Sequence, residues 1–297
     1  MNYPSFRVSW VTYTCLFASG TASLAYELIW FRHLTLVFGA SLYALSAVLC
    51  AFMIGLVGGA WVMGRVLGRI HAELEPRKLI RLYGVLEGLI GLYALFFPLE
   101  LDLLEKLYPL ILPASREVGL TVHLLEFSLS TLLMFPATLL MGATLPLVGY
   151  WVTGNQTEKV FTQVSLLYGI NTLGAVFGCL FTQFFAIRLL GVQGTTWFAI
   201  VINVVIFMVC YGRAQIFYVV EPSPPETKKN KGKEETKCSP AISILVLAMF
   251  AYSGMASLSS EILWTRILVF PMGSTLYSFA LILATFLSGI AFGSLTA

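Results

Sequence analysis

Charged residues are scarce in this sequence. Asp, Glu, Lys and Arg make up 11% of its 297 residues, whereas a soluble domain contains about 25%. The formal net charge is only +3, which argues against a nucleic-acid partner, because such proteins carry a marked basic excess. Hydrophobic residues reach 58% and the mean hydropathy is +0.85. The composition therefore excludes an ordinary soluble domain and predicts a protein of the lipid bilayer.

The sequence also lacks the motifs of common soluble enzymes and metal sites. Its five cysteines form neither a CxxC pair nor a Cys/His ligand pattern. It contains no GxGxxG fingerprint, no phosphate-binding P-loop and no HExxH zinc motif. We therefore expect no metal and no cofactor in this chain, and no motif identifies a catalytic residue.

Long apolar runs are what the sequence has in abundance. A helix needs about 20 apolar residues to cross a bilayer. The runs predict helices over residues 9–30, 38–63, 80–99, 122–151, 161–187 and 190–211, with a short interfacial helix at 101–112. The first run is longer than a signal-peptide core, so we expect it to remain as the first helix. With two more helices after residue 240, we predict an all-α, polytopic transmembrane bundle of about eight helices.

An internal repeat divides the chain into two like parts. The motif Ser-Gly-x-x-Ser-Leu-x-x-Glu-x-x-Trp-x-Arg begins at Ser19 and again at Ser253, and the ungapped register then continues to Gly59 and Gly293. Such a repeat dictates architecture. It predicts a first six-helix repeat over 1–220, a Pro/Lys-rich linker over 221–240 and a truncated second repeat over 241–297. If the second part matches the first, we expect four further helices beyond Ala297.

The distribution of Lys and Arg predicts the topology. Basic residues cluster between the second and third predicted helices and again in the linker. The positive-inside rule then places the N-terminus and the linker in the cytoplasm and residues 100–121 outside, in a cell (inner) membrane. An even number of helices precedes the linker, so the two copies are parallel. We therefore expect a major-facilitator-like six-helix half followed by the first two helices of a parallel second repeat.

Glu27 and Glu261 occupy equivalent positions in the two copies and are the first candidate site. Each is followed five residues later by an arginine, Arg32 or Arg266. A charge inside a bilayer usually finds a partner within the bundle. Each glutamate is expected to pair with the arginine of its own copy at a helix corner, or with the arginine of the other copy. The functional interpretation is an ion-pair gate or an acidic pair that binds polyamine; the structural one is a clamp on two helix corners.

Two further polar residues lie inside predicted helices. Glu87 has no basic residue one turn away, so its partner is expected to come from another helix. It is interpreted either as a proton-coupling carboxylate or as a neutral carboxyl group at a close helix crossing. Asn171 is interpreted as interhelical glue or as a ligand contact. Close helix packing is also predicted at three GxxxG steps, formed by Gly55 and Gly59, Gly174 and Gly178, and Gly289 and Gly293.

Four sequence elements together resemble a known family. They are the repeated Glu-Trp-Arg motif, Gly64–Arg69 (GRVLGR), Met141–Pro146 (MGATLP) and Tyr168–Gly178. With these, the chain resembles the membrane portion of the fused major-facilitator/spermidine synthase family, also called membrane-bound spermidine synthase-like proteins. In that family the multi-helix region is often followed by a soluble, Rossmann-like aminopropyltransferase-type domain. Its glycine- and aspartate-rich loop, which binds decarboxylated S-adenosylmethionine, has no counterpart here. The usual aspartate of the major-facilitator loop is also missing from 64–69.

The resemblance implies a membrane module that scaffolds or channels a polyamine-type metabolite. Transferase activity would then belong to a soluble catalytic domain absent from this chain. A major-facilitator-like transporter of a small cationic or proton-coupled solute is the alternative, and a purely structural membrane anchor is the third. The expected partners are the bilayer, a small cationic metabolite, and a soluble catalytic domain or further copies of the chain.

Overall fold

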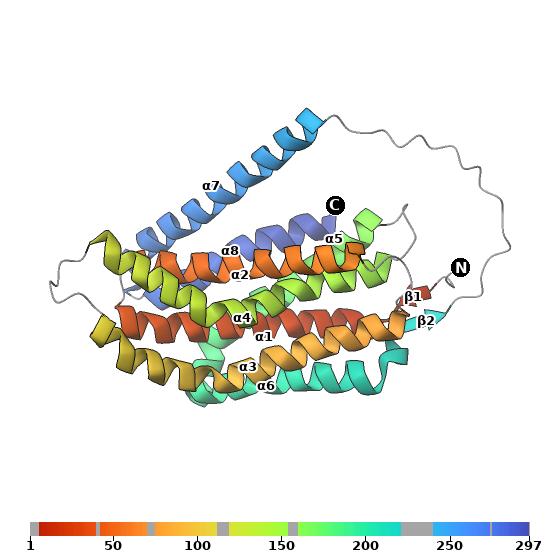
Figure 1. The fold of residues 1–297 in the computed structure, drawn as a ribbon, viewed down its shortest axis with the longest axis horizontal. Helices are drawn as coiled ribbons and strands as arrows, with labels where there is room; N and C mark the ends of the chain where they lie inside the picture. The colour runs from red at the N-terminus through yellow and green to blue at the C-terminus, as the bar shows by residue number, and fades with distance from the viewer. Residues whose placement is uncertain are drawn as a thin grey trace.

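The computed structural model describes residues 6–39, 42–69, 75–111, 119–153, 160–220, 240–273 and 275–296. Within these ranges the chain is helical, apart from one small ribbon of two strands (Figure 1). The helices are α1 (Trp10–Phe38), α2 (Leu42–Arg69), α3 (Pro76–Ile111), α4 (Leu120–Thr153), α5 (Val160–Phe181), α6 (Ile187–Gly212), α7 (Pro240–Met272) and α8 (Thr275–Thr296). The predicted all-helical fold is thus confirmed. The predicted linker, 221–240, lies outside the described residues except for Pro240.

Six of the described segments are long and apolar enough to cross a membrane, which supports a multi-pass membrane protein. The prediction of about eight spanning helices is not confirmed by this measure. One segment, Phe161–Gly212, contains both α5 and α6, and α1 is not among the six. The polarity of α1 has a structural reason: Ser19, Thr21 and Glu27 all lie on this helix and are buried against other helices.

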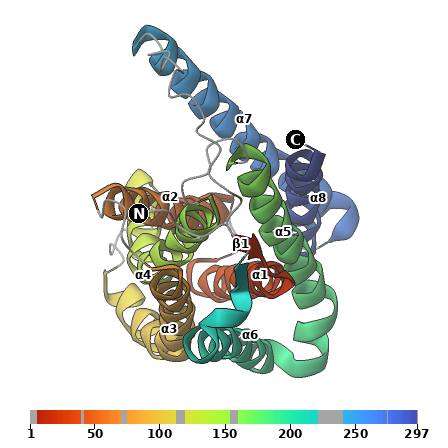
Figure 2. The ribbon, with the colours of Figure 1, turned by 90° about the vertical axis from the view of Figure 1, so that its right-hand side faces the viewer.

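Helix α1 runs through the middle of the bundle (Figure 2). It contacts α2, α3, α4, α5, α6 and α8. Its aromatic residues Tyr26, Trp30 and Phe31 are at most 1% exposed. At its start, a ribbon of β1 (Phe6–Val8) and β2 (Tyr218–Val220) joins the N-terminal segment to the end of α6, and the Ser9 amide donates a 2.9 Å hydrogen bond to the Phe217 carbonyl. The central position means that α1 meets protein, rather than lipid, on most sides.

The two copies of the repeat share their turn, and the first helix of each copy contacts the second helix of the other. Both first helices end at a glycine with positive φ, Gly39 (90°) and Gly273 (65°), which are equivalent positions of the repeat. A residue with a Cβ rarely adopts such a φ. Helix α1 contacts α8 while α2 contacts α7, which is the reciprocal pattern that two related units make. Phe31 of α1 and Phe279 of α8 pack with ring centroids 4.7 Å apart.

Several helices are longer than the sequence predicted. Helix α1 passes through the expected corner at Arg32 and continues to Phe38, because the first positive-φ glycine is Gly39. The expected interfacial helix at 101–112 is the continuation of α3, which contains Pro98 without ending there. A proline removes one helical hydrogen bond, and a membrane helix tolerates that loss where neighbouring groups satisfy the freed backbone carbonyl.

The step from α5 to α6 is made by irregular helix. A π-helix, Thr182–Ala186, follows α5 directly. Gly191 then adopts φ 70° and ψ 177°, which kinks the helix near the start of α6. Between α5 and α6 the chain reverses its direction (Figure 1). This places α5 against α1 and α6 against α3.

Glycines bring two pairs of helices into backbone contact. At the crossing of α2 with α4, a Cβ on Gly59 would lie 1.9 Å from the Leu139 carbonyl oxygen, and one on Gly55 would lie 1.7 Å from the Thr138 hydroxyl. At the crossing of α1 with α5, Gly174 and Gly178 approach the main chain of Phe17 and Thr21 equally closely. By contrast, no described atom lies within 4 Å of the Cβ position of Gly289 or Gly293 on α8.

The unequal surroundings of equivalent glycines give a matched test. Gly59→Ala should lower the free energy of unfolding in detergent by about 1–3 kcal/mol, because the α4 backbone has to move away. Its repeat counterpart, Gly293→Ala, should be neutral or stabilise by about 0.5–1 kcal/mol, the usual gain for alanine over glycine in a helix. Thermal unfolding of both purified variants measures the difference. Equal effects would show that the α2–α4 crossing is not as tight as described.

Candidate functional site

Glu87 of α3 joins three helices through hydrogen bonds. Its side chain is fully buried. Ser19 Oγ of α1 donates a hydrogen bond to Oε1, and Asn203 Nδ2 of α6 donates one to Oε2. Both hydrogen bonds are 2.6 Å long. As the sequence predicted, the partners come from other helices. Because both carboxylate oxygens are occupied, Glu87 serves as a structural link between α1, α3 and α6.

The Glu87 network continues into an aromatic stack. Tyr26 OH donates a 2.8 Å hydrogen bond to Asn203 Oδ1. The Tyr26 ring stacks on Trp30 with centroids 5.3 Å apart, and Trp30 stacks on Phe97 at 4.7 Å. This side of α1 is therefore fixed by both hydrogen bonds and ring packing. Sequence reasoning missed Tyr26 and Asn203, whose mid-helix polar groups were the available signal.

Glu27 of α1 and Glu261 of α7 are both buried and lie within electrostatic range of each other, although they are far apart in the sequence. Glu27 is 3% exposed and Glu261 is 6% exposed. The two carboxyl groups are close enough for their charges to interact. In the described part of the chain, neither Oε1 atom has a hydrogen-bond partner. Two equivalent acidic residues of the repeat are thus buried within electrostatic range of each other, each with one acceptor atom unused.

The expected glutamate–arginine pairs do not form. Among the described residues, the ion pairs are Lys106 with Asp102 and His123 with Glu126. Arg32 is half-buried and Arg266 is exposed. The reason is the straight course of α1 and α7: residues five apart on a helix point about 140° away from each other. The proposed clamp of two bent corners therefore has no counterpart in the structure.

Other polar groups lie close to the glutamate pair. The Cys179 thiol of α5 is in electrostatic range of both carboxyl groups and donates a 3.3 Å hydrogen bond to the Ala280 carbonyl of α8. Thr182, the first residue of the π-helix one turn further on, has a buried hydroxyl without a hydrogen-bond partner in the described structure. Sequence reasoning missed both. The glutamate pair and Cys179 place the site beside α8, which contacts α1, α5 and α7.

The chemistry of this pair is that of a cation or proton site. A carboxylate in a membrane interior is costly unless a partner neutralises it. Two carboxylates that share a site cannot both stay ionised without such a partner. No basic side chain of the described ranges pairs with them. A bound cation or a shared proton would supply the missing positive charge.

Asn171 of α5 lies against α1 through its main chain. A Cβ on Gly20 of α1 would lie 2.1 Å from the Asn171 carbonyl oxygen of α5. Thr21 Oγ1 of α1 donates a 3.0 Å hydrogen bond to the carbonyl of Gly174, which lies one turn after Asn171 on α5. The segment around Asn171 is thus part of the close α1–α5 crossing.

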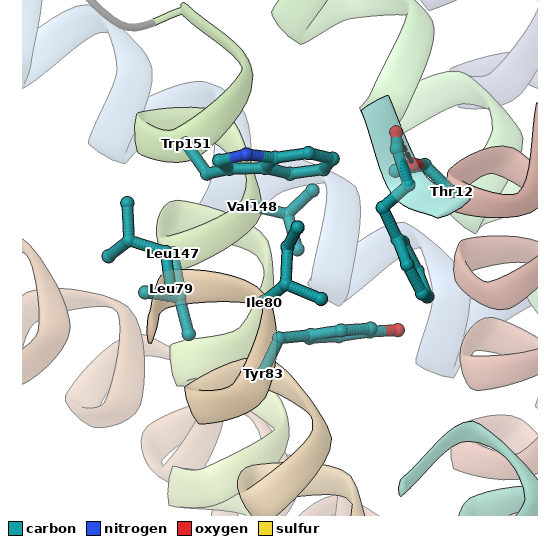
Figure 3. A pocket seen from close by; sticks show the side chains of 8 residues that line it. Thr12, Leu79, Ile80, Tyr83, Leu147, Val148 and Trp151 are labelled. Carbon is teal, nitrogen blue, oxygen red and sulfur yellow. Dashed lines mark hydrogen bonds between the residues drawn. The ribbon is translucent and has the colours of Figure 1, made fainter. Parts of the chain in front are cut away.

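A small cavity near the N-terminal end of α1 is not a metabolite site (Figure 3). Thr12, Ile80, Tyr83 and Trp151 are among its lining residues, and its volume is about 10 Å³. That space holds one water molecule at most. Nor do the described residues contain a group of three or more His, Cys, Asp or Glu side chains that could hold a metal ion.

Comparisons with known proteins found no relative of this chain. No protein-family model, no curated protein and no solved structure matches it. The geometry of the buried polar groups therefore carries the argument for function.

The Glu87 network predicts a strong effect on stability. Glu87→Leu should lower the free energy of unfolding by about 2–5 kcal/mol, because the Ser19 hydroxyl and the Asn203 amide lose their acceptors. Glu87→Gln keeps one acceptor oxygen and should cost less. Denaturant unfolding of the two variants in detergent measures both. An unchanged midpoint for Glu87→Leu would contradict the structural role.

Proposed function

We propose that this chain is a multi-pass membrane module that binds a small cation between its two repeats, at Glu27 and Glu261. One observation carries the proposal: equivalent residues of the repeat place two buried carboxyl groups within electrostatic range of each other, each with an Oε1 that has no partner in the described structure. A structural ion pair would have included a basic side chain. A cation that enters from outside the protein restores the charge balance instead.

We further propose that the chain is the membrane portion of a fused major-facilitator/spermidine synthase protein. It would comprise about eight spanning helices: a six-helix half and the first two helices of a parallel second repeat. The Glu-Trp-Arg motif in both copies, the positive-φ glycines at equivalent turns and the reciprocal α1–α8 and α2–α7 contacts support this. Counting α1 as a spanning helix is consistent with its polar residues facing protein.

The cation would be a polyamine-type metabolite, which the module scaffolds or channels. Multiply charged amines can satisfy two carboxylates with one molecule through charge-assisted hydrogen bonds. Aminopropyl transfer would require a soluble catalytic domain as partner, because no catalytic motif occurs in residues 1–297. We place the N-terminus and the linker in the cytoplasm of a cell (inner) membrane, supported by Arg65, Arg69 and Lys78 at the facing ends of α2 and α3.

A transporter is the second candidate, favoured by the packing of α7. This helix leans away from the bundle and is exposed over most of its length (Figure 1). Of the described elements, it contacts chiefly α8 and α2. One of the two carboxylates therefore lies on the least packed helix, where movement of α7 would open the site. A proton-coupled or cation-coupled cycle needs such a movable element.

Binding of spermidine tests the proposed site. Purified protein in detergent should bind labelled spermidine saturably, and Glu27→Gln or Glu261→Gln should weaken binding by about tenfold or more, since each removes a charge-assisted hydrogen bond. Glu126→Gln is the control, because Glu126 is a buried carboxyl group already bonded to Tyr108 and His123. Equilibrium dialysis gives the affinities. Absence of saturable binding would reject the polyamine site, and accumulation in liposomes distinguishes a transporter from a scaffold.

Stability without a cation gives an independent test. Glu27→Gln should raise the free energy of unfolding by about 1–3 kcal/mol in cation-free detergent at alkaline pH, because the pair has then lost its shared proton and carries an unbalanced buried charge. Glu126→Gln should lower it, because that carboxyl group accepts bonds from its neighbours. Thermal unfolding of both variants shows whether each one raises or lowers the stability of the protein. A loss of stability in Glu27→Gln would identify Glu27 as a structural clamp.

A further inference from the structure

We propose that Cys15 of α1 and Cys210 of α6 form a redox-active pair, which an uncharged two-electron oxidant such as a quinone or a diazene converts into a disulfide. Both thiols are free, so the structure describes the reduced state of the pair. Neither cysteine belongs to the site at Glu27 and Glu261, whose neighbouring thiol is Cys179. The inference is therefore independent of the function proposed above.

The side chains of Cys15 and Cys210 contact each other, although the two residues are far apart in the sequence. Both belong to one cluster of buried side chains, at 8% and 0% exposure, and helices α1 and α6 contact each other directly. A side-chain hydrogen bond joins the two thiols. A disulfide forms without backbone movement only where the two side chains point toward each other. This pair already meets that requirement.

Contacts on both sides of the pair hold the two helices together. On one side, the ribbon of β1 and β2 joins the segment before α1 to the segment after α6. On the other side, Glu87 accepts hydrogen bonds from Ser19, one turn after Cys15, and from Asn203, about two turns before Cys210. Because α1 and α6 are fixed at both places, the thiols between them stay close and lose little freedom when they are linked.

Unequal exposure assigns different roles to the two thiols. Cys15 retains a small accessible surface, whereas Cys210 has none. Gly84 of α3 also packs against Cys210, since a Cβ on Gly84 would lie 2.6 Å from the Cys210 Cβ atom. An oxidant dissolved in the bilayer therefore reacts with Cys15, and Cys210 then attacks the Cys15 sulfur, as in ordinary thiol–disulfide chemistry.

The reaction is balanced in atoms and electrons. With the diazene diamide, the Cys15 thiol adds across the N=N bond and forms an S–N bond. The Cys210 sulfur then attacks the Cys15 sulfur, so that the S–S bond forms and the S–N bond breaks. Both thiol hydrogens end on the two nitrogen atoms, and the diazene is reduced to a hydrazine while the two cysteines are oxidised. A quinone accepts the same two hydrogens and two electrons as it becomes a hydroquinone.

Oxidation with diamide tests the pair in the full chain. Cys50→Ser combined with Cys238→Ser leaves three of the five cysteines, namely Cys15, Cys179 and Cys210. After diamide treatment in detergent, unfolding and labelling with a maleimide, we expect the label on Cys179 alone, and peptide mapping should find Cys15 joined to Cys210. A dithiol reductant should restore labelling of all three thiols.

Cys179 is the internal control, because it is also buried but bonds to the Ala280 carbonyl. Three labelled thiols after oxidation, or a cross-link that contains Cys179, would overturn the proposal.

Thermal unfolding of the same protein gives a second measurement. The oxidised form should have a Tm about 5 °C or more above that of the reduced form, because a disulfide restricts the unfolded chain. Cys210→Ala in the same background removes one partner and should abolish this shift. A shift that persists in Cys210→Ala would overturn the proposal, since it could not come from this disulfide.

Discussion

Every polar side chain on α1 has to find its partner inside the bundle, because the hydrocarbon core of a bilayer offers none. Ser19 meets this requirement at Glu87, Thr21 at the Gly174 carbonyl, and Tyr26 at Asn203. Two buried groups do not meet it within the described structure: Glu27 Oε1 and Trp30 Nε1. The first is an acceptor within electrostatic range of Glu261 on α7, and the second is a donor enclosed by the aromatic rings of Tyr26, Tyr93 and Phe97. The unmet bonding of Glu27 is the reason to expect a ligand on its side of the helix.

Small residues make these polar contacts reachable. Side-chain hydroxyls are short, so Thr21 can bond a carbonyl of α5 only if the two backbones approach closely. The glycines of α5 permit that approach, since a Cβ on Gly174 would lie 2.0 Å from the Phe17 carbonyl oxygen. The same crossing carries Cys179 toward the glutamate pair. The close packing at the glycines therefore sets the distances between the buried polar groups of neighbouring helices.

The sequence predicted what depends on composition and repetition, and missed what depends on which helix lies opposite. Apolar runs gave the helices, and the repeat indicated equivalent turns, which the structure has at Gly39 and Gly273. The Glu–Arg pairs were wrong because the corner at Arg32 does not exist; α1 stays helical to Phe38. Glu27 comes within electrostatic range of Glu261 only through the tertiary arrangement of α1 and α7, and helical periodicity contains no information about that neighbour.

Differences between the two copies separate the functional pair from the structural network. Tyr26, which links α1 to Asn203, is replaced by Ser260 in the second copy, and Ser260 bonds within its own helix. Trp30 is fully buried, whereas its counterpart Trp264 is 54% exposed. The surroundings of the two helices have thus diverged, yet Glu27 and Glu261 are both present and both buried. A residue kept only to fix α1 in place would have no reason to recur, without a partner, on the loosely packed α7. The acidic pair is therefore explained better by what it binds than by what it holds together.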